Sequence, residues 1–317
     1  MKVTDHISRA QSTLFSFEIL PPLKGKSIES IYQSIDPLME FKPSFINVTY
    51  HREEYVYKKR ACGYLEKVFI RKRPGTVGIC AAIINKYKTD ALPHLICGGF
   101  SKEETENALI DLQYLGIDNV LALRGDPIKT EQVFIPEPDG NKYAVDLVKQ
   151  IVELNKGEYL DEEMGTASPT EFCIGVAGYP EKHFEAPNMQ FDLLNLKAKV
   201  DAGADYVITQ LFYDNAKYFE YVKAARAIGI NVPIIPGLKP MTLKKQTSII
   251  PKIFSIDIPY DLADAFAKAK SDDETREIGI EWSIAQSKEL IKFGVPCLHY
   301  YTMGKSEAVR RIAKAVL

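Results

Sequence analysis

Short apolar runs recur along the chain, and each is separated from the next by a stretch with the spacing of an amphipathic helix. A run of four to eight mostly apolar residues is typical of a strand that is covered on both faces, as in a parallel sheet. Eight such runs occur, at residues 14–20, 45–50, 91–97, 119–125, 172–179, 206–212, 233–238 and 297–303. The alternation predicts an α/β protein with eight parallel strands.

The helical stretches carry their own start and stop signals. Residues 101–116, SKEETENALIDLQYLG, begin with Ser101 and Glu104 at capping-box spacing and end at Gly116. Three other helical patterns end in AGADYV, IGINVP and FGVPCL, where glycine suits a left-handed helix end and a strand follows. This repeated joint favours a (β/α)8 TIM barrel. An open doubly wound sheet is the alternative, but neither G-x-G-x-x-G after a strand nor a P-loop motif is present.

Two segments are longer than a barrel requires. Residues 51–76 have a strong local basic excess, and residues 127–142 are rich in proline and polar residues. Because both follow predicted strands, we expect extended loops at the C-terminal face of the strands, where such loops act as lids or ligand walls. Surface loops of no special role are the alternative.

Composition narrows the class of protein. Hydrophobic residues make up 46% of the chain and charged residues 26%, and the net charge of -2 leaves no global basic excess for nucleic acid or a membrane surface. With no secretion signal and no apolar run of roughly 18 residues, the sequence predicts a cytoplasmic protein with one domain, residues 1–317. Five cysteines without a CxxC pair indicate reduced core thiols.

The first apolar run contains an unexpected acid. In LFSFEILPP, Glu18 stands among phenylalanine, isoleucine and leucine, and burying an ionised carboxylate costs several kcal/mol. A carboxyl held by apolar neighbours keeps its proton and suits general acid catalysis, whereas a head group that reaches solvent is the alternative reading. Other candidates at the ends of predicted strands are Thr49, Tyr50, His51, His94, Arg124, Asp126, Tyr179, Glu181, His183, Gln210, Tyr213, Tyr301 and Lys305.

Taken one at a time, these residues could equally have a purely structural role. His94 suits a core histidine as well as a ligand contact, and Arg124 with Asp126 suits a pair that shapes a glycine turn. The histidines lack the spacing of a metal site, and no G-x-S-x-G nucleophile motif occurs. The residues alone therefore predict acid-assisted chemistry on a planar ligand or cofactor, without naming the reaction.

Eight motifs, in order, resemble the methylenetetrahydrofolate reductase family. They are FSFEILPP, INVTY, PHLIC, LALRGD, GYPEKHFEA, DLLNLKAKVDAGAD, ITQLFYD and IIPGLKP. The resemblance implies an FAD-binding TIM barrel that reduces 5,10-methylenetetrahydrofolate to 5-methyltetrahydrofolate with NADH or NADPH, in one-carbon metabolism and methionine biosynthesis. It also implies the short bacterial form, with a catalytic barrel but no regulatory domain, assembled as a homo-oligomer (dimer or tetramer).

The resemblance assigns roles to residues as well. It implies that Glu18 is the general acid and that Asp126 is a second catalytic residue, which contacts the pterin and lies near the flavin, where its charge can tune flavin reduction. Implied FAD contacts are Thr49, Tyr50, His94, Arg124, Gly125, Asp126, Ala144, Tyr179, His183, Ala186, Asp192, Asn195 and Lys199. Implied folate contacts are Glu18, Asp126, Gln210, Gln246 and Lys305, where Lys305 replaces the expected arginine.

The family's ping-pong scheme is implied too, with nicotinamide and folate occupying the same space in turn. The choice between NADH and NADPH stays open. A flavin barrel acting on a different planar substrate and a barrel without catalytic activity are the alternatives.

Overall fold

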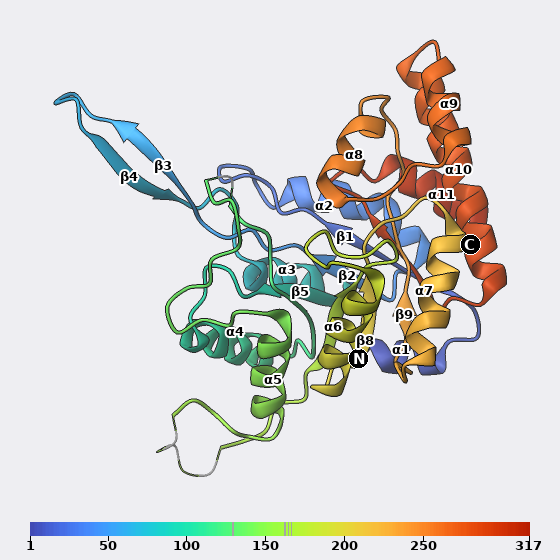
Figure 1. Ribbon diagram of the computed structural model, residues 1–317. Helices are drawn as coiled ribbons and strands as arrows, with labels where there is room; N and C mark the ends of the chain where they lie inside the picture. The colour runs from blue at the N-terminus through green and yellow to red at the C-terminus, as the bar shows by residue number, and fades with distance from the viewer. Residues whose placement is uncertain (129, 162, 164, 166) are drawn as a thin grey trace.

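The computed structural model describes residues 1–128, 130–161, 163, 165 and 167–317. Parallel strands form a cylinder surrounded by helices (Figure 1). In sheet order from β1, the neighbours are β2, β5, β6, β7, β8 and β9 on one side and β11 and β10 on the other. The strands are β1 (Leu14–Ile19), β2 (Phe45–Val48), β5 (Asp90–Ile96), β6 (Asn119–Leu123), β7 (Cys173–Gly178), β8 (Tyr206–Thr209), β9 (Ile234–Ile235), β10 (Gly237–Leu238) and β11 (Cys297–Tyr301).

Two short strands, β9 and β10, replace the single strand predicted at 233–238. They are separated by Pro236, which has no N–H group for a sheet hydrogen bond. Because β9 pairs with β8 and β10 pairs with β11, the barrel still closes. The TIM-barrel prediction is confirmed, with one wall position divided between two strand pieces.

Helices cover the outside of the barrel (Figure 1). They are α2 (Glu29–Ile35), the 3-10 helix η1 (Asp36–Phe41), α3 (Thr76–Tyr87), α4 (Lys102–Tyr114), α5 (Ala144–Asn155), α6 (Met189–Asp201), α7 (Asn215–Ala227), α8 (Gln246–Phe254), α9 (Tyr260–Lys268), α10 (Asp272–Phe293) and α11 (Glu307–Val316). The predicted capping box of Ser101 and Glu104 is present. The four predicted glycine exits have left-handed φ angles, +69° at Gly116, +118° at Gly203, +81° at Gly229 and +89° at Gly294.

The strands contribute to two separate apolar layers. Phe17 and Ile19 of β1 belong to the large cluster that joins the strands to the helices. Phe45 and Tyr206 belong to a smaller cluster inside the barrel. Since successive side chains of a strand point to opposite faces, Glu18 points into the barrel while its sequence neighbours pack outward.

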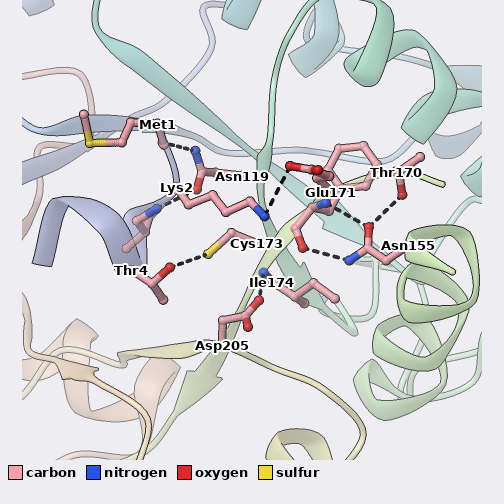
Figure 2. A network of polar contacts seen from close by, with 12 residues as sticks. Met1, Lys2, Thr4, Asn119, Asn155, Thr170, Glu171, Cys173, Ile174 and Asp205 are labelled. Carbon is pink, nitrogen blue, oxygen red and sulfur yellow. Dashed lines mark hydrogen bonds and ion pairs between the residues drawn. The ribbon is translucent and has the colours of Figure 1, made fainter. Parts of the chain in front are cut away.

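A short N-terminal helix, α1 (Val3–Arg9), closes the end of the barrel at which the strands begin. The buried Val3 joins the inner apolar cluster. Asn119 holds the segment, since its Oδ1 accepts from Val3 N–H at 2.8 Å and its Nδ2 donates to Met1 O at 2.8 Å. Figure 2 shows Met1, Lys2 and Thr4 lying against Asn119 and Cys173. This helix was not predicted from the sequence, and neither was α9.

The basic segment 51–76 was predicted to be an extended loop, but it contains an antiparallel hairpin. Its strands are β3 (Glu54–Lys59) and β4 (Leu65–Ile70), and the ribbon projects away from the barrel (Figure 1). The other long segment, 127–142, has no helix or strand among its described residues. Cys62 lies exposed in the hairpin turn, so the prediction of five core thiols was wrong at this position; the other four cysteines are buried.

Within the described part of the chain, no helix is long and apolar enough to cross a membrane.

Candidate active site

A cavity of about 970 Å³ opens where the barrel strands end. Its wall includes residues that directly follow or end β1, β2, β5, β6, β7, β8, β10 and β11. This is the face at which TIM-barrel enzymes place their active sites, and the size is that of a cofactor or substrate pocket. The cavity is therefore the candidate active site.

Glu18 lines this cavity and is 8% exposed. Burial raises the pKa of its carboxyl from 4.5 to about 8, although the nearby cation of Lys239 lowers it. The apolar residues next to Glu18 in sequence do not cause this burial, because they point outward. The interior of the closed barrel does, and it leaves the carboxyl protonated at neutral pH.

His94 is an ionisable residue next to Glu18, with its Nε2 3.3 Å from Glu18 Oε2. Burial lowers the pKa of His94 to about 3, with a smaller contribution from His51. The two groups therefore form a neutral contact at pH 7 rather than an ion pair. Asn47 Nδ2 lies 3.4 Å from the same ring nitrogen, within hydrogen-bonding range.

Lys239 and Tyr301 share a layer of the barrel with Glu18. Glu18 of β1 pairs with Tyr301 of β11. On the other side of β11, Leu238 of β10 pairs with Tyr300, so the next residue, Lys239, is level with Tyr301. All three line the cavity. Tyr301 donates its hydroxyl hydrogen to Thr209 O at 2.7 Å, which fixes the ring between the acid and the lysine.

The opposite wall contains a separate cluster of charges. Arg124, at the end of β6, donates to both carboxylate oxygens of Glu185, at 2.5 Å and 2.9 Å. Its guanidinium carbon also lies 5.1 Å from the centre of the Phe134 ring. A guanidinium held in this way presents a planar set of donors to an anion that competes with the carboxylate.

Lys199 is the second cation of this wall. Burial lowers its pKa to about 8, although Asp192 opposes the shift, and its Nζ donates to Ala177 O at 2.6 Å. Asp192 accepts from the backbone N–H of His183 at 3.2 Å, and burial raises its pKa. The rings of His183 and Tyr179 meet edge to face with centroids 4.8 Å apart.

The cavity wall contains fifteen of the seventeen residues to which the resemblance assigns a role, and of the other strand-end candidates it contains His51 and Tyr301 but not Glu181 or Tyr213. All of the implied FAD contacts line the cavity, together with Glu18 and Gln210. Gln246 and Lys305 are not part of the wall. The Gln246 side chain is used locally, since its Oε1 accepts from the backbone N–H of Thr242 at 2.7 Å and of Leu243 at 2.9 Å.

Sequence reasoning missed several wall residues, above all Lys239, Phe191 and Met303. Lys239 had a usable signal, because it directly follows the last residue of a predicted strand. Met303 had one as the last residue of the strand predicted at 297–303, although β11 ends at Tyr301, whereas Phe191, in the first turn of α6, had none. Only the folded barrel places Phe191 beside the strand ends.

Comparison with known proteins decides the family. The family model described as methylenetetrahydrofolate reductase matches residues 2–316. The chain belongs to the methylenetetrahydrofolate reductase family. The 5,10-methylenetetrahydrofolate reductase of Escherichia coli (strain K12) is 33% identical, and the alignment covers 92% of this chain and 86% of that protein. The resemblance inferred from the eight motifs is confirmed.

Longer members of the methylenetetrahydrofolate reductase family match as well. Methylenetetrahydrofolate reductase 1 of Schizosaccharomyces pombe is 33% identical over 98% of this chain but only 48% of its own length. The chain thus spans about half the length of such relatives. A solved structure, titled an uncharacterized protein from Clostridium thermocellum that binds two copies of 5-methyl-5,6,7,8-tetrahydrofolic acid, aligns with a TM-score of 0.61 and 16% identity over 99% of this chain, which supports the fold.

Proposed function

We propose that this protein reduces 5,10-methylenetetrahydrofolate to 5-methyltetrahydrofolate with NADH or NADPH, through bound FAD and in two half-reactions at one site. The observation that carries the proposal is the protonated, buried Glu18 in the strand-end cavity of a methylenetetrahydrofolate reductase family member. Relatives named as NADH-dependent and NADPH-dependent support a nicotinamide donor. The folate-binding structural neighbour supports a folate ligand.

The cavity fits FAD in its charge as well as its size. Lys199 and Arg124, whose nearby carboxylates are Asp192 and Glu185, would together meet a pyrophosphate. The aromatic ring of Tyr179 offers a stacking surface in the same wall. When bound, FAD would accept a hydride from the nicotinamide nucleotide and deliver it to the one-carbon unit of the folate.

The side chains of the protein would supply the proton that the reaction needs. The five-membered ring of the substrate must open before it accepts hydride, and opening requires a proton on the departing nitrogen. Glu18 holds a proton at neutral pH. Because His94 beside it is uncharged, the imidazole places no positive charge there that would lower the pKa of Glu18. We propose that Glu18 donates this proton, while Asp126 and Gln210 of the same wall contact the pterin.

A test separates this function from its two alternatives. The purified protein should be yellow and release FAD on denaturation. Mixed without oxygen, it should lose its flavin absorbance with NADH or NADPH and recover it with methylenetetrahydrofolate. Reduction by the nucleotide with no reoxidation by the folate would point to another flavin barrel. A colourless protein that takes up no flavin would indicate a barrel without this catalytic activity.

A further inference from the structure

The hairpin formed by β3 and β4 is a large feature that the proposed chemistry does not use. It leaves the barrel after β2 and extends far beyond it (Figure 1). Only residues at its base, including His51 and Arg52, line the cavity. An isolated two-stranded ribbon is at best marginally stable in water, so a ribbon of this kind is normally packed against something.

One face of the ribbon is rich in apolar and aromatic groups. The register places Tyr55 opposite Phe69 and Tyr57 opposite Lys67, so these side chains share a face with Leu65. Lys67 Nζ lies 4.0 Å from the centre of the Tyr55 ring. Tyr57, Phe69 and Leu65 are 60%, 63% and 66% exposed. Apolar side chains grouped at this exposure mark an interaction surface.

The ribbon is also strongly basic. Residues 52–73 contain eight basic and three acidic residues, a net charge of +5, although the whole chain carries -2. The remainder of the chain therefore carries -7. The lysines near the tip, Lys58 and Lys59, are exposed. Two such ribbons packed on each other would repel, which argues against a ribbon-to-ribbon contact.

A surface of opposite charge lies on the far side of the same molecule. Residues 257–281, which contain α9 and the first half of α10, hold eight acidic and three basic residues, a net charge of -5, and Arg311 of α11 pairs with Glu277 there, which leaves a net charge of -4. Tyr260, at the start of α9, is 80% exposed and gives this surface an apolar group as well. Figure 1 shows the hairpin and α9 at opposite sides of the molecule, so the hairpin does not reach the α9 of its own chain.

We propose that the hairpin of one molecule packs on the acidic surface of residues 257–281 of a second copy, and that the reciprocal contact closes a two-fold dimer. Opposite charges bring the two surfaces together, and burial of Tyr57, Phe69 and Tyr260 stabilises the contact. A two-fold arrangement uses each hairpin and each acidic surface once, and it leaves neither exposed for further association. Because the hairpin begins at the cavity rim, the same contact holds that rim in place.

Charge reversal tests this contact. The variant Lys58→Glu/Lys59→Glu reverses two exposed charges near the ribbon tip. The matched control, Lys149→Glu/Lys156→Glu, makes the same change of charge at exposed lysines on α5 and at its end. The rescue variant adds Asp261→Lys/Asp264→Lys on α9 to the hairpin variant. Molar mass is measured by light scattering at micromolar concentration in low salt and in high salt, and thermal unfolding checks that each variant is folded.

The expected result is twice the chain mass for the wild type and the control, one chain mass for the hairpin variant, and twice the chain mass again for the rescue variant. High salt should weaken the wild-type dimer, because exposed charges are screened. A monomeric wild type, or a hairpin variant that remains dimeric, would overturn the proposal. A dimer that is lost in the hairpin variant but not restored by the rescue variant would overturn the assignment of residues 257–281 as the partner surface.

Discussion

Glu18 and His94 face each other in the cavity wall with their nearest atoms 3.3 Å apart, and both are uncharged at neutral pH. The carboxyl keeps its proton because burial raises its pKa to about 8. The imidazole stays neutral because the same burial lowers its pKa to about 3. A proton donor is thereby held next to a group that does not carry a competing positive charge.

The first prediction concerns the general acid. Glu18→Gln removes the transferable proton but keeps the size and polarity of the side chain. We expect the folate half-reaction to slow roughly 100- to 10,000-fold, while reduction of the flavin by NADH or NADPH is retained. Anaerobic stopped-flow absorbance measures both steps. Glu153→Gln, on the exposed side of α5, is the control. Equal losses in both half-reactions would mean that Glu18 serves binding or folding instead.

The second prediction concerns pH. Only the protonated form of Glu18 can donate, so the rate of the folate half-reaction should fall as pH rises through about 8. Stability should follow the same group. Because the folded pKa lies above the ordinary 4.5, the wild type should lose stability relative to Glu18→Gln as pH rises from 4.5 to about 8. Rate profiles and urea unfolding at several pH values measure the two effects. A flat difference in stability over this range would contradict a buried, protonated acid.

The third prediction assigns Lys239 as a positioning residue for Glu18. Its cation lowers the pKa of Glu18 from the same barrel layer, on the far side of Tyr301 of β11. Lys239→Met should therefore move the pH limit of the folate half-reaction upward, and Lys239→Arg should largely restore it. The single-turnover pH profile measures this shift. A loss of rate with no change in the profile would show that Lys239 acts only through packing or substrate contact.

The fourth prediction concerns the cation that would meet the pyrophosphate. Arg124 is engaged by Glu185, which is partly exposed and competes with a bound anion. Arg124→Met should weaken FAD binding by roughly 10- to 150-fold, the value of a charged hydrogen bond of about 1.5 to 3 kcal/mol. Glu185→Gln should instead strengthen it. Fluorescence titration of the flavin-free protein measures both. If the two variants weakened binding alike, the ion pair would be needed to hold Arg124 in place.

The fifth prediction concerns the base of the barrel. Asn119 is buried and holds the N-terminal segment through two hydrogen bonds (Figure 2). Asn119→Ala should lower the free energy of unfolding by about 1 to 3 kcal/mol, because it leaves a buried backbone N–H without its partner. Urea unfolding measures the loss, and Ser8→Ala on the exposed part of α1 is the control. An unchanged unfolding midpoint would show that α1 contributes little to closing the barrel.

Local patterns explain why much of the fold was predictable. The apolar runs and the glycine helix ends depend only on neighbouring residues, so strand and helix positions follow from them. The hairpin was missed because its alternating residues, Glu54–Lys59 and Leu65–Ile70, are interspersed with charges that suggested a loop. The N-terminal α1 was missed because its seven residues offer one buried side chain, Val3, and its stability comes from contacts with the barrel.

The residues of the candidate site also fall into those that local sequence patterns identified and those that they did not. Most of its residues were found because they end strands or belong to the family motifs. Gln246 was assigned to the site by the family resemblance, yet its side chain accepts hydrogen bonds from the backbone N–H groups of Thr242 and Leu243 in the turn before its own helix. Lys239 was not selected because it matters through its effect on Glu18. The two residues are far apart in sequence and are brought into one barrel layer only by the pairing of β1 and β10 with β11.

The sequence by itself determined the alternation of barrel strands with helices, the family, and the identity of the one acid that does not suit a strand. Only the tertiary structure decided why that acid is protonated. The residues adjacent to Glu18 in sequence point away from it, since side chains alternate along a strand. Closure of the barrel removes its carboxyl from water and sets His94 and Lys239 around it, because inward-facing residues of β5 and of the segment after β10, each two strands away from β1, reach the same interior.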